Sequence, residues 1–262
     1  MSDIIGAGGG GEGSSHTPIE ANDTLQSRQV VKLLLVISEG EIEDVEDIFL
    51  NKVSISNFSA TWAWRAGTGT QTVMPGFINT EEPIGSFSPV TLTTGTEFVT
   101  AIPYDAQSCR ITFTLSLLKQ ITEDNDTVGY TVQYNVYTRP SSAAVWTFYT
   151  TITKTGKSTG PYSWDTPIRA PAGVTVASSW EIKVIRTTIA DDGKHFSPTQ
   201  WSAATAIRES NLTYNNSALV SITLTDAQQF GGNIPEIAFK VKGIKVKIPD
   251  NYDAANHLYD ET

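Results

Sequence analysis

Arg110-Ile111-Thr112-Phe113-Thr114-Leu115-Ser116-Leu117 alternates strictly, with an apolar residue at every odd position and a polar one at every even position. Successive side chains of a β-strand point to opposite faces, so this pattern predicts a strand with one buried and one wet face. The alternation returns at residues 130–137, and further strands are indicated at 145–152 and 180–186. Several such strands with turn signals between them predict an antiparallel β-sandwich over about residues 104–212.

The two ends of the chain carry longer apolar strands. The run Val30 to Ile37 and a second strand at 48–53 are joined through an acidic loop. Near the C-terminus we expect strands at 219–224 and 239–248. The apolar pattern of the last strand slips by one residue at Gly243, which is typical of a β-bulge or a sharp bend.

Composition limits the classes of function. The chain has 262 residues, 39% hydrophobic and 18% charged, which is enough to bury a sizeable core. Its net charge of -10 argues against a general nucleic-acid binder, although an acidic wall would let DNA pass without sticking. A single cysteine, Cys109, excludes an internal disulfide framework. We expect neither a membrane span nor a secretory signal, because no stretch has the required apolar length or basic flank.

The N-terminal residues 1–16 are rich in Gly and Ser and should be flexible in isolation, because they cannot bury enough surface to offset their ordering entropy. The Gly run lacks the Gly-Lys-Ser/Thr of a phosphate loop. Thr17 and Pro18 then have the pattern of a helix start, which predicts a short helical turn to about Asp23.

Two charged constellations admit more than one interpretation. The acidic cluster at 39–47 lacks the spacing of a calcium loop, so we interpret it as a solvated or interface loop rather than a cation site. A lysine stripe could face DNA or an acidic neighbouring subunit, or it could be a solvated, edge-protecting face. Its members are Lys240, Lys242, Lys245 and Lys247.

The sequence offers no catalytic constellation. The three histidines are scattered, with neither metal-ligand spacing nor a Gly-x-Ser-x-Gly elbow, so we expect no enzyme and no cofactor. The six tryptophans are interpreted as core and interface anchors. Exposure of Trp64, Trp146 and Trp201 on one face would instead favour a carbohydrate-binding, adhesin-like β-sandwich that recognises the host surface.

Three stretches carry family-like motifs in a fixed order: GSSHTPIEANDTLQS (13–27), then ISEGEIE (37–43) with IFLN (48–51), then ALV (218–220), QFGG (229–232) and GIKVKIPDNYD (243–253). Together they resemble the N-terminal region of the host-specificity proteins (protein J) of lambda-like siphophages. The middle of the chain, about 57–212, matches only loosely, as β-rich sequence.

The resemblance implies a mainly β fold: a tail-hub β-barrel or sheet domain built from both ends of the chain, with an inserted antiparallel β-sandwich. Residues 1–27 would be a flexible Gly-rich arm, residues 28–56 plus 217–262 the hub domain, and residues 57–216 the inserted region. Because a small barrel or sheet must pair distant strands, we expect residues 28–37 to share a sheet with 219–248.

The resemblance also implies a virion structural protein, the central hub of a siphophage tail tip, which closes the distal tail tube and organises attachment and DNA ejection. It would be a homotrimer, assembled in the bacterial host cytoplasm, in contact with distal tail-tube proteins, other tail-tip proteins and the tape-measure protein. DNA would pass only transiently. Host receptor binding is expected in a C-terminal portion beyond Thr262. Candidate interface residues are Thr17, Pro18, Glu39, Gly40, Gln229, Phe230, Gly231, Lys240, Lys242, Lys245 and Lys247.

Overall fold

The strands of the protein form two units. A computed structural model describes residues 16–175, 178–245, 252–253 and 258–259. The first unit contains residues 1–26, 85–104 and 110–204, and the second contains residues 27–84, 105–109 and 205–262. The described residues form strands and two short 3-10 helices, so the predicted mainly β fold is confirmed.

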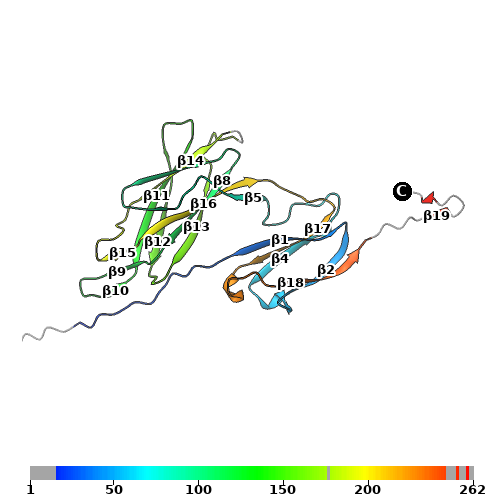
Figure 1. The fold of residues 1–262 in the computed structure, drawn as a ribbon, viewed down its shortest axis with the longest axis horizontal. Coiled ribbons are helices and arrows are strands. Elements are labelled where there is room, and N and C mark those ends of the chain that lie inside the picture. Colours follow the sequence, from blue (N-terminus) through cyan, green and yellow to red (C-terminus); the bar gives the residue numbers. More distant parts are fainter. Residues whose placement is uncertain (1–15, 176–177, 246–251, 254–257, 260–262) are drawn as a thin grey trace, which may run out of the picture. The chain divides into compact units, whose positions relative to one another are not determined.

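The first unit is built around an antiparallel sandwich (Figure 1). One sheet has the order β12 (Thr147–Gly156), β11 (Tyr130–Pro140), β14 (Trp180–Arg186), β7 (Glu97–Ile102). The other has the order β13 (Tyr162–Arg169), β8 (Ser108–Leu115), β16 (Thr199–Glu209), β5 (Asn79–Pro83), and β6 (Val90–Thr91) also pairs with β16. In this sheet β5 and the ends of β8 and β16 belong to the second unit. A small sheet contains β10 (Thr127–Val128), β9 (Lys119–Ile121) and β15 (His195–Phe196).

The sandwich core follows the alternation that predicted it. Ile111, Phe113 and Leu115 are fully buried, while the residues between them are half-buried. Phe113 stacks on Tyr134 of the opposite sheet with ring centroids 5.0 Å apart and an interplanar angle of 17°. Trp164 also belongs to this cluster, with its ring centroid 5.4 Å from that of Phe113. Such aromatic contacts add to area burial, so this cluster anchors the two sheets to each other.

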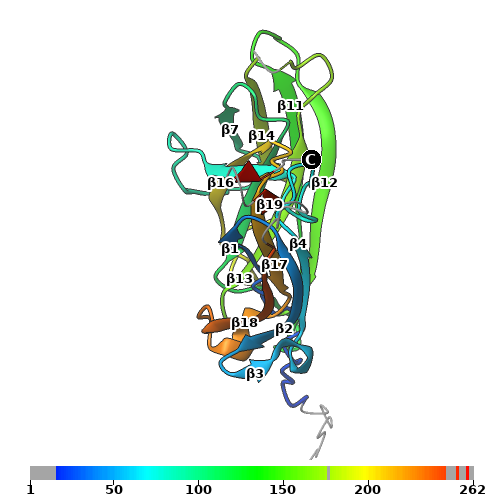
Figure 2. The ribbon, with the colours of Figure 1, turned by 90° about the vertical axis from the view of Figure 1, so that its right-hand side faces the viewer.

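The second unit joins strands from both ends of the chain (Figures 1 and 2). One sheet has the order β1 (Val31–Glu39), β17 (Ser217–Leu224), β4 (Ala60–Arg65), and the other has the order β18 (Ile237–Ile244), β2 (Ile42–Leu50), β3 (Val53–Ser54). The unit also contains the 3-10 helices η1 (Ile55–Asn57) and η2 (Ala227–Phe230) and the short pair β19 (Tyr252–Asp253) and β20 (Leu258–Tyr259).

The register of β1 on β17 confirms the expected pairing of the two chain ends. Val31 lies opposite Leu224, and Leu35 lies opposite Val220. The rest of the C-terminal stretch pairs differently, because β18 is hydrogen-bonded to β2. A single apolar core serves both sheets. In the described part of the chain, hydrogen bonding therefore produces two three-stranded sheets rather than a closed barrel.

The acidic loop predicted at 39–47 is wrong, because most of it is strand β2. Ile42, Val45 and Ile48 are each at most 4% exposed, so burial of the apolar residues outweighs the local run of charge. The predicted strand at 48–53 is also divided. Asn51 and Lys52 have positive φ angles of 49° and 69° and form a tight turn into β3.

The bulge predicted at Gly243 lies elsewhere. Pairing runs without a break from Lys242 opposite Asp44 to Ile244 opposite Ile42, and the register shifts between Lys240 and Val241 instead. The extra residue is Glu46 on β2. An inserted residue restores the phase of a strand, so Val45 and Ile48 fall on one face despite their spacing of three.

The helical turn predicted from Thr17 to about Asp23 is also wrong. Residues 16–25, here called the strap, run extended along the sandwich of the first unit, and Glu20 forms a parallel bridge with Thr127. The N–H of Ala21 donates to Thr127 rather than to a residue of its own segment. Residues 1–15 of the expected flexible arm 1–27 lie outside the described residues.

Candidate assembly surfaces

The lysine stripe and the acidic cluster meet across β18 and β2 and form a charge ladder. The pairs are Lys240–Glu46, Lys242–Glu43 and Lys245–Glu41, with Nζ-to-carboxylate distances of 2.8, 3.7 and 2.8 Å. Opposite charges on neighbouring antiparallel strands stabilise one register over another. Lys247 lies outside the described residues.

Electrostatics within the ladder follow from these contacts. The hydrogen bond from Lys240 lowers the pKa of Glu46, and the reciprocal hydrogen bonds raise the pKa values of Lys240 and Lys245. The lysine side chains remain about half exposed or more, so salt screens these pairs. The stripe is thus largely neutralised by its own neighbours.

The described residues contain no group of three or more His, Cys, Asp or Glu side chains arranged to hold a metal ion. Within the same residues, no helix is long and apolar enough to cross a membrane.

Glu39 and Gly40 form the corner between β1 and β2. Gly40 has a φ of 90°, and its N–H donates to the carbonyl oxygen of Asn216 at 2.7 Å. A Cβ on Gly67 would lie 2.5 Å from the carbonyl oxygen of Gly40, so two glycines allow this close approach of backbones. The local sequence at this corner is therefore set by folding, while the exposed Glu39 side chain is available to a neighbour.

Gln229, Phe230 and Gly231 end helix η2. Phe230 packs on Phe58 at 4.9 Å between ring centroids, beside the core of the second unit. The Gln229 side chain accepts a hydrogen bond from the N–H of Ser59 at 3.3 Å. Gly231 takes the left-handed conformation, with φ of 64°, that commonly follows a helix.

Thr17 and Pro18 are exposed residues of the strap. On either side of them, backbone contacts fix the strap to the sandwich. The N–H of Ile19 donates to Asp126 at 2.8 Å, and the N–H of Thr127 donates to the carbonyl of Ile19 at 2.8 Å. His16 also contacts Asp126 at 2.6 Å.

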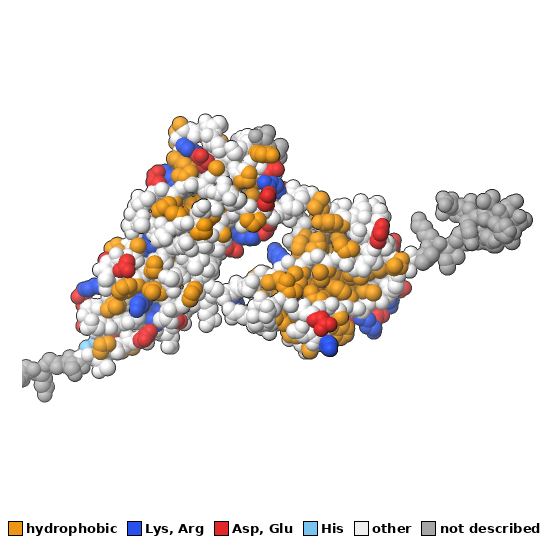
Figure 3. Space-filling model, viewed as in Figure 1, with side chains coloured by type: hydrophobic (Ala, Val, Ile, Leu, Met, Phe, Trp, Pro, Cys, Tyr) orange, Lys and Arg blue, Asp and Glu red, His pale blue; other side chains and the backbone are white. Residues whose placement is uncertain are grey.

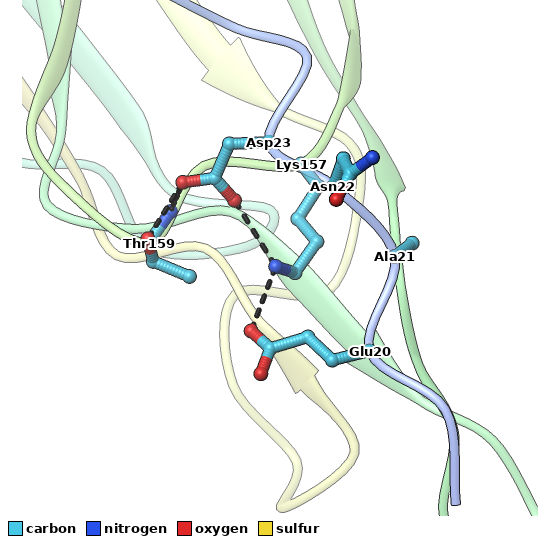
Figure 4. A pocket seen from close by; sticks show the side chains of 6 residues that line it. All are labelled: Glu20, Ala21, Asn22, Asp23, Lys157 and Thr159. Carbon is cyan, nitrogen blue, oxygen red and sulfur yellow. Dashed lines mark hydrogen bonds and ion pairs between the residues drawn. The ribbon is translucent and has the colours of Figure 1, made fainter.

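Lys157 forms a polar pocket under the strap (Figure 4). Its side chain is 3% exposed, and its ammonium donates to Glu20 at 2.8 Å and to Asp23 at 3.0 Å. The hydroxyl and N–H of Thr159 donate to the other oxygen of Asp23. These bonds, with that from Lys157, lower the pKa of Asp23 to about 2.

Sequence reasoning did not identify this pocket. Glu20 and Asp23 are separated from Lys157 and Thr159 by most of the sandwich, and no local pattern marks Lys157 as buried. The one available signal was the acidic character of the segment after Pro18.

The tryptophans do not form an exposed platform. Trp201 is 1% exposed, and Trp64 packs against the core of the second unit. Trp146 is half-buried, with the Arg139 guanidinium 4.3 Å and the Lys183 ammonium 5.0 Å from its ring centroid. A carbohydrate-binding surface would require these three tryptophans to be exposed on one face, and they are not.

The matching family model and two similar proteins carry the same name, tip attachment protein J. The family model described as the FNIII-A domain of tip attachment protein J matches residues 81–210. Tip attachment protein J of Escherichia phage SECphi4 is 31% identical over 277 residues, a match that covers 98% of this chain and 23% of the relative. The protein of the same name from Escherichia phage SECphi27 is 23% identical and covers 98% of this chain and 22% of the relative. The chain thus spans less than a quarter of the length of these relatives.

Among solved structures, a family 11 carbohydrate-binding module from Clostridium thermocellum, in complex with a mixed-linked tetrasaccharide, covers 64% of this chain and 92% of its own length at 10% identity. Its TM-score is 0.23, which supports no statement about fold or ligand.

Proposed function

Since this chain corresponds to an N-terminal region of the phage tip attachment protein J family, we propose that it is a structural protein of a phage tail tip. In this proposal it is the central hub, which closes the distal tail tube and organises attachment and DNA ejection. The observation that carries the proposal is the match to the tip attachment proteins along 98% of the chain.

The architecture supports a hub because the two chain ends share one sheet. The pairing of β4 with β17 brings together the strands that precede and follow the inserted sandwich. A sheet unit built from both ends of the chain suits a ring component that also carries an inserted module. Neutralisation of the lysine stripe supports a channel wall that lets DNA pass without holding it.

We propose that three copies assemble around an axis through the second unit. The strand β1 is at the edge of its sheet in the described chain, and its Val36 is 66% exposed. Hydrophobic side chains gather over this unit in Figure 3. An edge strand with apolar side chains is a surface that a neighbouring copy can cover, and in a closed ring the same contact repeats.

Light scattering of the purified chain tests the trimer. We expect a mass three times that of the 28.4 kDa chain. Val36→Lys should shift the protein to folded monomers, with an unfolding temperature that is lower and no longer depends on protein concentration. Val145→Lys is the matched control, since Val145 is 77% exposed on the sandwich. A chain that stays monomeric at high concentration would contradict the homotrimer.

Electron microscopy of assembled phage tests the location. A small tag in the exposed turn at 191–194 should bring its antibody to the distal end of the tail. Label along the tail tube or on the capsid would refute a place in the tip. Contacts with tail-tube and tape-measure proteins would be tested by cross-linking in the same particles.

A further inference from the structure

We infer that the sandwich of the first unit carries a recognition groove for an extended acidic peptide, and that the strap of the same chain is its ligand. The groove is formed by Asp126, Thr127, Gly156, Lys157 and Thr159 (Figure 4 shows its charged end). This inference is independent of the proposed place in a phage tail.

Backbone recognition in the groove resembles the addition of a strand. Thr127 uses both of its backbone groups, accepting from the N–H of Ala21 at 2.9 Å and donating to Ile19 at 2.8 Å. Further along, the carbonyl of Lys157 accepts from the N–H groups of Thr24 and Leu25. Main-chain bonds of this kind give a peptide site affinity without dependence on sequence.

Side-chain recognition makes the groove selective for acidic residues. Both carboxylates that pair with the buried ammonium of Lys157 come from the strap. A buried charge is costly unless it is paired, so the groove disfavours a ligand without carboxylates at these positions. The spacing of Glu20 and Asp23 places both on one cation.

Gly156 provides the steric part of the recognition. A Cβ at this position would lie 2.6 Å from the hydroxyl of Thr24 and 2.8 Å from Cγ of Leu25. Gly156 also has a φ of 153°, which residues with a side chain rarely adopt, so both the backbone and the strap favour glycine here. A methyl group at this position should displace the strap while leaving every charge in place.

The strap has the character of a bound ligand rather than a core element. None of residues 16–25 belongs to the buried core, and the bonds that hold the strap connect it to the sandwich. The sandwich core of Ile111, Phe113 and Leu115 is complete without it. Release of the strap should thus leave the sandwich folded, and a free peptide of the same sequence should then bind.

Fluorescence anisotropy with a labelled peptide of residues 13–27 tests the groove on the full chain. A tethered ligand competes at an effective concentration of about millimolar, so the wild-type chain should exclude the peptide. The double variant Glu20→Gln, Asp23→Asn weakens the tethered strap and should bind the wild-type peptide at least about 10-fold more tightly than the wild-type chain does. A peptide with the same two substitutions should not bind.

Two further variants separate recognition from folding. Adding Lys157→Met to the double variant should abolish peptide binding, and so should adding Gly156→Ala. Gly173→Ala is the matched control, because Gly173 also has a positive φ, 86°, and a Cβ there meets nothing within 4 Å. Unfolding temperatures verify that each variant is folded. A folded double variant that fails to bind the peptide would overturn the inference, as would a Gly156→Ala combination that binds as well as the control.

Discussion

Lys240 lies opposite Asp47 in the register of β18 and β2, yet its ammonium pairs with Glu46, at 2.8 Å. Glu46 is the residue that shifts the register, so the salt bridge marks the bulge. Charge and burial act together here, because the same inserted residue aligns Val45 with Ile48 in the core.

Deletion of Glu46 should be tolerated, because it leaves Val45 and Ile48 two residues apart, on one face and opposite the same partners on β18. Deletion of Phe49, in the regular part of the same strand, is the control. It puts the buried Ile48 and Leu50 on opposite faces and should cost more than about 2 kcal/mol of unfolding free energy. Urea denaturation of both variants provides the comparison, and a Glu46 deletion as damaging as that of Phe49 would contradict the bulge.

Arg186 should be intolerant even of lysine. It is fully buried and donates hydrogen bonds to carbonyl or hydroxyl oxygens of Thr188, Ile189, Ser197 and Thr199. Burial lowers the pKa of its guanidinium. Lysine cannot reproduce this fork of donors, so Arg186→Lys should leave buried acceptors unpaired, at about 1–3 kcal/mol each. Thermal unfolding measures the loss, and a variant as stable as wild type would show that the network is dispensable.

Acid should release the charged end of the strap within a defined range. Docking lowers the pKa of Asp23 to about 2 from its ordinary 3.8, so its contribution is complete above the ordinary value and is lost as pH falls toward about 2. Exchange protection of the Thr24 and Leu25 amides, followed by NMR, should decrease over this interval. In Asp23→Asn that protection should be weak at every pH. An unchanged acid profile in this variant would assign the transition to another group.

A rise in pH should weaken the docking of the other end of the strap, where His16 contacts Asp126. The hydrogen bond to Asp126 raises the pKa of His16 above its ordinary 6.5. A raised pKa stabilises docking below 6.5, and the stabilisation is lost as pH rises through the raised value. The ring protons of His16 report this pKa directly by NMR. In Asp126→Asn the pKa should return toward 6.5, and a value that does not move would locate the cause elsewhere.

The sequence predicts the fold best where the alternation of apolar and polar residues alone determines the structure, as in β8. Alternation at Ile111, Phe113 and Leu115 reflects a strand with one buried face, and all three are buried as predicted. Residues 42–47 of β2 were not predicted as strand, because Val45 and Ile48 are three residues apart among carboxylates. A bulge reconciles that spacing with a strand, and a bulge depends on the partner strand rather than on local sequence.

For the candidate surfaces, the sequence likewise shows the charged residues but not the contacts between them. The lysine stripe and the acidic cluster were each visible in the sequence, but their mutual pairing depends on the register of β18 against β2. Lys157 was not singled out at all. Its burial results from the strap, whose carboxylates lie far away in the chain, so no local window contains both partners.

The pairing of β1 with β17 also dictates an order of events during synthesis. β1 emerges from the ribosome early, whereas its partner emerges only after the whole sandwich. The sandwich is mostly continuous in sequence and can form first. During that time β1 has apolar side chains and unpaired backbone N–H and C=O groups. Until Leu224 has been synthesised, this strand lacks its partner and is open to misassociation, and a chaperone that shields it would act in that interval.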